Sequence, residues 1–102
     1  MYIVTRAHTR PSTDISFFYP KDIATLEFKK YFLDTYINTG KSIVIEHSHS
    51  DDNLTMTSTS MWDLVDSFNQ FINDPVCNEF ISVATEYNNA NGITETVTLT
   101  DI

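Results

Sequence analysis

Three histidines are the side chains with the clearest capacity for chemistry in this sequence. His47 and His49 are separated by one residue, and Asp51 and Asp52 follow directly. Alternate residues of a β-strand point to the same side, so two imidazoles could share a metal ion with a carboxylate from the turn. A zinc site needs three or four ligands, and we expect His8 on a strand about 10 Å away. We therefore predict no metal site. His47 and His49 are the candidate ligands of the weak site that we considered.

Other reactive groups are few. Cys77 is the only cysteine. It follows a helix start, which would stabilise a thiolate, but no histidine neighbours it in the sequence, and we interpret it as a small buried hydrophobe. With only Gly40 and Gly92 available, no phosphate-cradling loop can be assembled, and we predict no cofactor. One cysteine also excludes an internal disulfide, which fits a reducing compartment and favours a cytoplasmic location.

The charge balance narrows the range of partners. Six Lys and Arg against fourteen Asp and Glu give a net charge of −8. Nucleic acids and anionic membrane surfaces require clustered cations, so we predict neither as a partner. No apolar run approaches the about 20 residues of a membrane span, and the N-terminus lacks the order of a signal peptide. These observations leave a small acidic domain that is free to bind a protein.

Hydrophobic periodicity predicts the elements that position these residues. Their order is β-α-β-β-α-β in one α+β domain over residues 1–102, the ferredoxin-like arrangement, with a four-stranded antiparallel sheet and helices on one face. Ser60 and Asp63 have the spacing of a helix start, and Asp74-Pro75 breaks the second helix and begins its continuation. The predicted strands are Tyr2–Thr9, Lys41–His49, Leu54–Met61 and Ile93–Thr100; the helices are Lys21–Thr39 and the two parts of residues 63–91.

Strict alternation in the last strand predicts one buried face. Ile93, Glu95, Val97 and Leu99 would point to the core, and the threonines between them would point away.

Two surfaces are candidates for binding. Thr55, Thr57 and Thr59 would share the open face of the sheet with the threonines of the last strand. This face is solvated, or covered by a second copy of the chain, or a ligand cleft with Trp62 and Tyr2 as its aromatic walls. The loop residues Phe17, Phe18 and Tyr19 either pack on the domain's own core or form a subunit contact or a lid.

The stretch Thr55–Phe80, with TSTSMW, DLVDSFNQFINDP and VCNEF in succession, resembles the antibiotic-biosynthesis-monooxygenase-like family of dimeric α+β barrels. The resemblance implies a homodimer in which two sheets cover each other's open faces. The family's haem-degrading branch uses an Asn on the first strand, a Trp at the end of the third and a His on the second helix. Only Trp62 matches, because the first strand has His8 and no Asn, and residues 63–91 contain no His.

Two functional hypotheses follow. The first is a small acidic interaction protein, a homodimer that acts through protein–protein contacts at the aromatic loop and the threonine face. The alternative is a cofactor-independent monooxygenase or isomerase of the dimeric barrel type. In that alternative, His8 and Trp62 are the candidate catalytic residues and line an apolar pocket.

Overall fold

A four-stranded antiparallel sheet is the base of the molecule. The structure is a computed structural model that describes residues 1–18 and 25–102. The strands lie in the order β2-β3-β1-β4, and each neighbouring pair is antiparallel. This order confirms the predicted ferredoxin-like fold and places the third strand between the first and the second. The strands are β1 (Tyr2–Thr9), β2 (Ser42–His49), β3 (Thr55–Trp62) and β4 (Thr94–Asp101).

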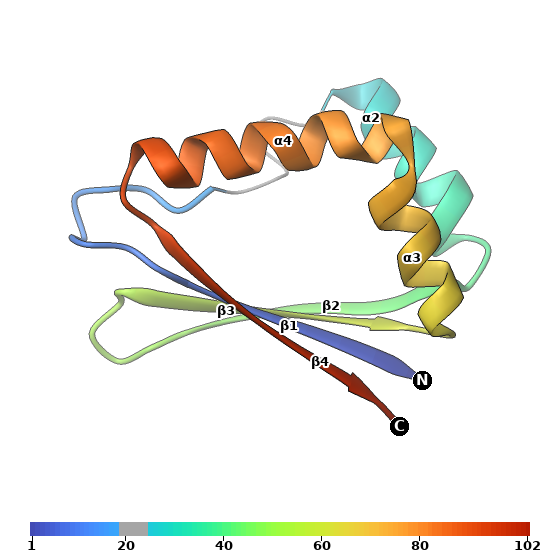
Figure 1. The fold of residues 1–102 in the computed structure, drawn as a ribbon, viewed down its shortest axis with the longest axis horizontal. Coiled ribbons are helices and arrows are strands. Elements are labelled where there is room, and N and C mark those ends of the chain that lie inside the picture. The colour runs from blue at the N-terminus through green and yellow to red at the C-terminus, as the bar shows by residue number, and fades with distance from the viewer. Residues whose placement is uncertain (19–24) are drawn as a thin grey trace.

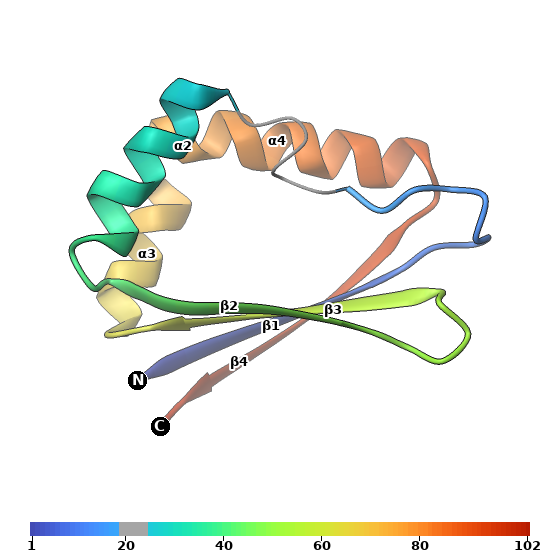
Figure 2. The ribbon, with the colours of Figure 1, turned by 180° about the vertical axis from the view of Figure 1, so that it is seen from behind.

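The described helices all lie on one side of this sheet, which we call the helix-facing side (Figure 1). The reverse view shows that the other side, called here the open side, carries no helix (Figure 2). None of the described helices is long and apolar enough to cross a membrane. The helices are α2 (Leu26–Phe32), a π-helical continuation η1 (Leu33–Ile37), α3 (Val65–Asn73) and α4 (Pro75–Ala90).

The break between α3 and α4 forms as predicted. Asp74 is the N-cap of α4, and its Oδ1 accepts a hydrogen bond from the Val76 N–H at 3.0 Å. Pro75 occupies the first helical position, where its missing N–H costs nothing. The hydroxyls of Tyr31 and Tyr36 donate to Asp74 Oδ2 at 2.5 and 2.7 Å, so this carboxylate also ties α2 and η1 to the junction.

Burial and hydrogen bonding perturb the acidity of this group of side chains. Burial opposes the charge of Asp74, but the hydrogen bonds from Tyr31, Tyr36 and the Val76 N–H outweigh it and lower the pKa of the carboxyl. Burial, followed by the bond to Asp74, raises the pKa of Tyr36. Burial also raises the pKa of the Cys77 thiol to about 11, which agrees with its predicted role as an inert core residue.

The predicted helix start at Ser60 and Asp63 is wrong. β3 continues through Ser60 to Trp62 because Trp62 pairs with both Tyr2 and Ser42. The Ser60 Oγ accepts from the Trp62 indole at 3.1 Å, and α3 begins only at Val65. The first helix also differs from the prediction. Its residues up to 24 lie outside the described part, and it ends in a π-turn in which the Asn38 N–H bonds the Leu33 carbonyl at 2.7 Å.

The hydrophobic core occupies one end of the helix-facing side. Trp62 lies at its centre, with ring contacts to Tyr36, Phe68 and Phe71 at centroid distances of 5.2–5.9 Å. Because this core gathers at the β1 start and the β3 end, the far half of the helix-facing side is left for other side chains. The buried residues of this cluster are Val4, Tyr36, Trp62, Phe68 and Cys77.

The prediction of a buried face on the last strand is wrong. β4 is exposed along its whole length, and the side chains of Val97 and Leu99 are 42% and 52% accessible. β4 is the outer strand of the sheet, so only β1 flanks it. Of the apolar residues expected on this face, only Ile93, which precedes the strand, is buried.

Candidate functional site

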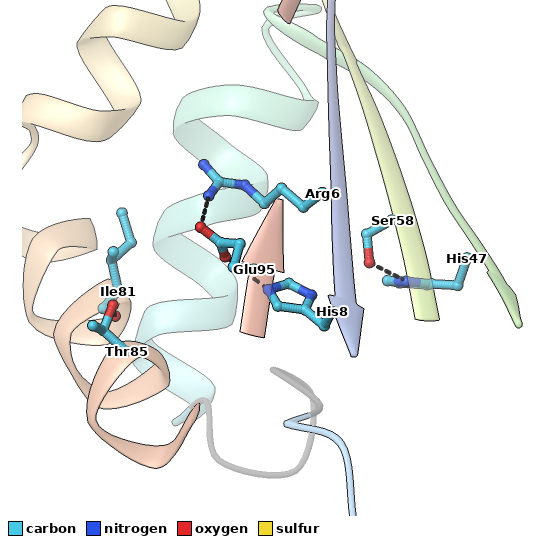
Figure 3. Close-up of polar contacts among 7 residues, drawn as sticks. All are labelled: Arg6, His8, His47, Ser58, Ile81, Thr85 and Glu95. Carbon is cyan, nitrogen blue, oxygen red and sulfur yellow. Dashed lines mark hydrogen bonds and ion pairs between the residues drawn. The ribbon is translucent and has the colours of Figure 1, made fainter. Parts of the chain in front are cut away.

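Polar and ionisable side chains gather on the helix-facing side of the sheet, at the end away from the core. We call Arg6, His8, Ser58, His47 and Glu95 the polar cluster (Figure 3). They come from all four strands: Arg6 and His8 from β1, Ser58 from β3, His47 from β2 and Glu95 from β4. The sequence disperses these residues, and only the sheet brings them together.

Strand register explains how they meet. Side chains alternate between the two sides of a strand, so Arg6 and His8 lie on the same side as the buried Val4. Glu95 pairs directly with His8 across β4 and β1. Ser58 pairs with Arg6 on β1 and with His47 on β2. Paired residues of an antiparallel sheet point the same way, and the cluster therefore occupies two adjacent rows of the sheet.

Glu95 contacts two other residues of the polar cluster, Arg6 and His8. Its Oε2 lies 2.7 Å from His8 Nε2, and its Oε1 accepts from Arg6 Nη1 at 3.4 Å. The Arg6 and Glu95 side chains are 34% and 39% accessible. Ion pairs this exposed contribute about 0–1 kcal/mol to folding. Stability alone is a poor explanation for placing three ionisable groups together here.

The His8–Glu95 contact orients the imidazole. A carboxylate accepts hydrogen bonds, so in the neutral ring the proton belongs on Nε2 and the lone pair on Nδ1. The His8 side chain is 16% accessible, so the ring is in partial contact with solvent. A histidine held in one tautomer by a carboxylate is the arrangement of a general base.

A hollow borders this cluster at Glu95. It has a volume of about 440 Å³ and lies between the end of α4 and the start of β4. Glu95 lines it from the sheet, and Thr85 lines it from α4. Its other lining residues are Asn88, Asn89, Ile93 and Thr94, and His8 is not one of them.

The structure separates the two predicted catalytic residues. Trp62 is 2% exposed in the core and pairs with Tyr2 at the start of β1. His8 lies six residues further along the same strand, which corresponds to about 20 Å. The prediction that His8 and Trp62 line one apolar pocket is therefore wrong. His8 belongs to the polar cluster, and the Trp62 indole packs in the core. Trp62 is also not on the same side of the sheet as Thr55, Thr57 and Thr59.

The aromatic loop packs inward where it is described. Phe17 is buried, with the Arg10 guanidinium 4.3 Å from its ring centroid. Phe18 contacts the rings of Phe80 and Tyr87 at 5.9 and 5.6 Å. These contacts are those of a flap on the domain's own core, one of the two alternatives from the sequence. Tyr19 lies outside the described residues.

The predicted threonine face exists. Thr55, Thr57 and Thr59 lie on the open side with the threonines of β4, and β1 separates the two sets. Thr5 stands between Thr59 and Thr98 in one such row. The Oγ1 atoms of Thr9 and Thr55 are 3.0 Å apart and hydrogen-bonded to each other.

His47 and His49 both project from β2 on the helix-facing side. His47 Nδ1 is hydrogen-bonded to Ser58 Oγ at 2.9 Å, and the ring of His49 lies 6.0 Å from that of Phe17. His8 and His49 both pair with Met56, so β3 separates them as the strand order predicted. Within residues 1–18 and 25–102, no three His, Cys, Asp or Glu side chains form a group that could hold a metal ion.

Sequence reasoning missed Arg6 and Glu95. The strand order was the signal that could have found them. In a ferredoxin-like sheet the first and last strands are neighbours. Glu95 on the last strand could therefore be expected to contact Arg6 or His8 on the first. Assigning Glu95 to a buried apolar face obscured it.

Comparison with known proteins supports the fold alone. No protein-family model matches this sequence, and no curated protein does. Several solved structures share the fold across nearly the whole chain. SnoaB, a cofactor-independent oxygenase from Streptomyces nogalater, has a TM-score of 0.60 at 13% identity, with 99% of this chain and 91% of that chain covered.

Two further structures agree. A protein from Deinococcus radiodurans provisionally assigned as an antibiotic biosynthesis monooxygenase has a TM-score of 0.57 at 11% identity, covering 100% of this chain and 92% of that one. A dimeric ferredoxin-like protein from an uncultured marine organism has a TM-score of 0.60 at 11% identity, covering 100% and 94%. This protein therefore has the fold of these monooxygenase-like and dimeric ferredoxin-like proteins, as the sequence resemblance predicted. At 11–13% identity this likeness concerns the fold alone, and both functional hypotheses stay predictions.

Proposed function

We propose that this protein is a homodimeric enzyme of the cofactor-independent oxygenase or isomerase type, in which His8 is the general base. The observation that carries the proposal is the 2.7 Å contact between His8 Nε2 and Glu95 Oε2 on the partly exposed helix-facing side of the sheet. The likeness in fold to SnoaB, described as a cofactor-independent oxygenase, agrees with it.

The proposed chemistry begins with proton abstraction. His8 Nδ1 takes a proton from an activated carbon of the substrate, and Glu95 stabilises the resulting imidazolium. Arg6, paired to Glu95 at 3.4 Å, supplies positive charge beside the enolate that forms. In an isomerase, the proton returns to another carbon. In an oxygenase, the enolate carbon reduces molecular oxygen, so a CH₂ group and O₂ yield a carbonyl group and water.

The open side of the sheet is the proposed dimer interface. No described helix covers it (Figure 2), and threonine methyl groups there alternate with the apolar side chains of Ile3, Ala7 and Met61. A sheet face of this composition can pack against its own copy, because threonine tolerates partial burial beside apolar groups. The description of one structural neighbour as dimeric agrees with this arrangement.

The direct test follows loss of deuterium from a panel of deuterated aromatic 1,3-diketones by NMR, together with oxygen uptake. We expect His8→Gln to slow exchange about 10²–10⁴-fold, which is the usual contribution of a general base. Glu95→Gln should cause a smaller loss, since it removes the charge that positions His8. The matched control is Glu86→Gln, which makes the same change at an exposed position of α4. Exchange at the wild-type rate in His8→Gln would contradict the proposal.

A further inference from the structure

The helix-facing side of the sheet carries Arg6 and the three histidines, although the protein as a whole is acidic. The chain carries a net charge of −8 and only three histidines. All three project from the two rows that contain the polar cluster, together with Arg6, and Glu95 is the one carboxylate in these rows. Arg6 is therefore the one permanently cationic side chain of these two rows, and it is the group on which an anion could bind.

Arg6 has unused capacity to bind an anion. A guanidinium has five N–H donors in a planar fork. Among the described residues, its hydrogen-bond partner is Glu95 alone, at a distance of 3.4 Å. This distance exceeds the usual 2.9–3.0 Å of an N–H···O bond. The other oxygen of Glu95 is committed to His8 at 2.7 Å. Arg6 is thus held in place but not saturated, and a ligand anion could bind its free edge in a bidentate manner.

The neighbours of Arg6 indicate what such an anion is attached to. On one side, Arg6 pairs with Val97, and Leu99 follows on the same side of β4. Both side chains are well exposed. On the other side, Arg6 pairs with Ser58, whose hydroxyl is hydrogen-bonded to His47. Arg6 therefore stands between an open apolar strip and a second polar pair.

We propose that the polar cluster binds an organic anion with an apolar body, whose anionic oxygens lie on Arg6 and whose apolar part lies on Val97 and Leu99. This inference rests on the proposed function, because it names the substrate class for the same site. A negatively charged group anchored at Arg6 lies one row of the sheet, about 7 Å, from His8, the general base.

The test compares two fluorescent probes that differ in one charged group. 8-Anilino-1-naphthalenesulfonate is an anion with an aromatic body, and N-phenyl-1-naphthylamine is its neutral counterpart. We expect Arg6→Gln to weaken binding of the sulfonate at least tenfold while changing binding of the neutral probe less than twofold. The matched control is Lys30→Gln, which removes the same charge from an exposed position of α2. Equal weakening by Lys30→Gln, or no weakening by Arg6→Gln, would overturn the proposal.

A second pair of variants covers the case in which Arg6→Gln does not fold. Val97 is exposed on the outer strand, so Val97→Asp is compatible with folding and places a carboxylate beside Arg6. The asparagine of Val97→Asn has nearly the same shape as the aspartate of Val97→Asp but carries no charge. The sulfonate should bind Val97→Asp at least tenfold more weakly than Val97→Asn, and equal binding to both would refute the anion site. His8→Gln should retain sulfonate binding, which separates failure of the anion site from failure of the proposed catalysis.

Discussion

Replacing Asp74 by alanine is expected to lower the free energy of unfolding by about 2–4 kcal/mol. The carboxylate is the N-cap of α4 through the Val76 N–H, and loss of an N-cap costs about 1 kcal/mol. It also accepts from the hydroxyl of Tyr36, which is fully buried. A buried hydroxyl left without a partner costs about 1–3 kcal/mol. For a domain with a total stability of about 5–15 kcal/mol, this loss is a large fraction.

Urea unfolding followed by the fluorescence of Trp62 measures this loss. Trp62 is the only tryptophan, it is 2% exposed, and its ring centroid lies 5.9 Å from that of Tyr36. Its emission therefore reports on the same part of the core. Asp74→Asn is the matched control, because asparagine is an equally good N-cap. We expect Asp74→Asn to cost less than Asp74→Ala.

A double-mutant cycle with Tyr36→Phe separates the two contributions. Phenylalanine removes the buried donor, so in that background Asp74→Ala should cost the cap, about 1 kcal/mol, together with the hydrogen bond from the less buried Tyr31 hydroxyl. The coupling between the two positions is then about 1–3 kcal/mol. If Asp74→Ala cost the same free energy in both backgrounds, the reasoning about the Tyr36 hydroxyl would be refuted.

Three further predictions follow from the same structure. The folded pKa of Asp74 is lowered from 3.8, so its contribution to stability is complete above that pH and is lost as pH falls through the folded pKa. Urea midpoints should therefore drop less in Asp74→Asn than in wild type between about pH 5 and pH 2. Thr5→Glu places like charges at the centre of the proposed dimer interface and should weaken association at least about 100-fold in light scattering, whereas Ser82→Glu on α4 should not. Cys77, buried and with a pKa raised to about 11, should react with a thiol reagent only after unfolding, and rapid labelling of the native protein would contradict its placement.

The sequence was sufficient for features that local rules control. Asp74 followed by Pro75 carries a complete helix-start signal, and α4 begins there. Asn53 and Gly40 have positive φ, the left-handed conformation that asparagine and glycine tolerate best. Strand order followed because few topologies satisfy a β-α-β-β-α-β sequence in one sheet.

Features that depend on contacts across the sheet were beyond the sequence. The meeting of His8 with Glu95 joins residues 87 positions apart, and a register shift of one residue would have placed Glu95 on the open side. The burial of Trp62 depends on α3 lying over its ring. Ser60 and Asp63 show how tertiary pairing outweighs a local signal, since strand pairing of Trp62 displaced the predicted helix start.

The placement of β1 at the centre of the sheet has a consequence for synthesis on the ribosome. β1 leaves the exit tunnel first, yet its partners lie far along the chain, with Thr9 bonded to a residue 46 positions later and His8 to one 87 positions later. Among the strands that the structure describes, β2 and β3 are the one pair that can close locally. Nascent chains therefore carry an unpaired central strand until β3 emerges, and such an edge is prone to pair with other chains. Slow decoding before residue 62 would lengthen that exposure. Slow decoding of β4 would matter less, because β4 adds an outer strand to a sheet that has already formed.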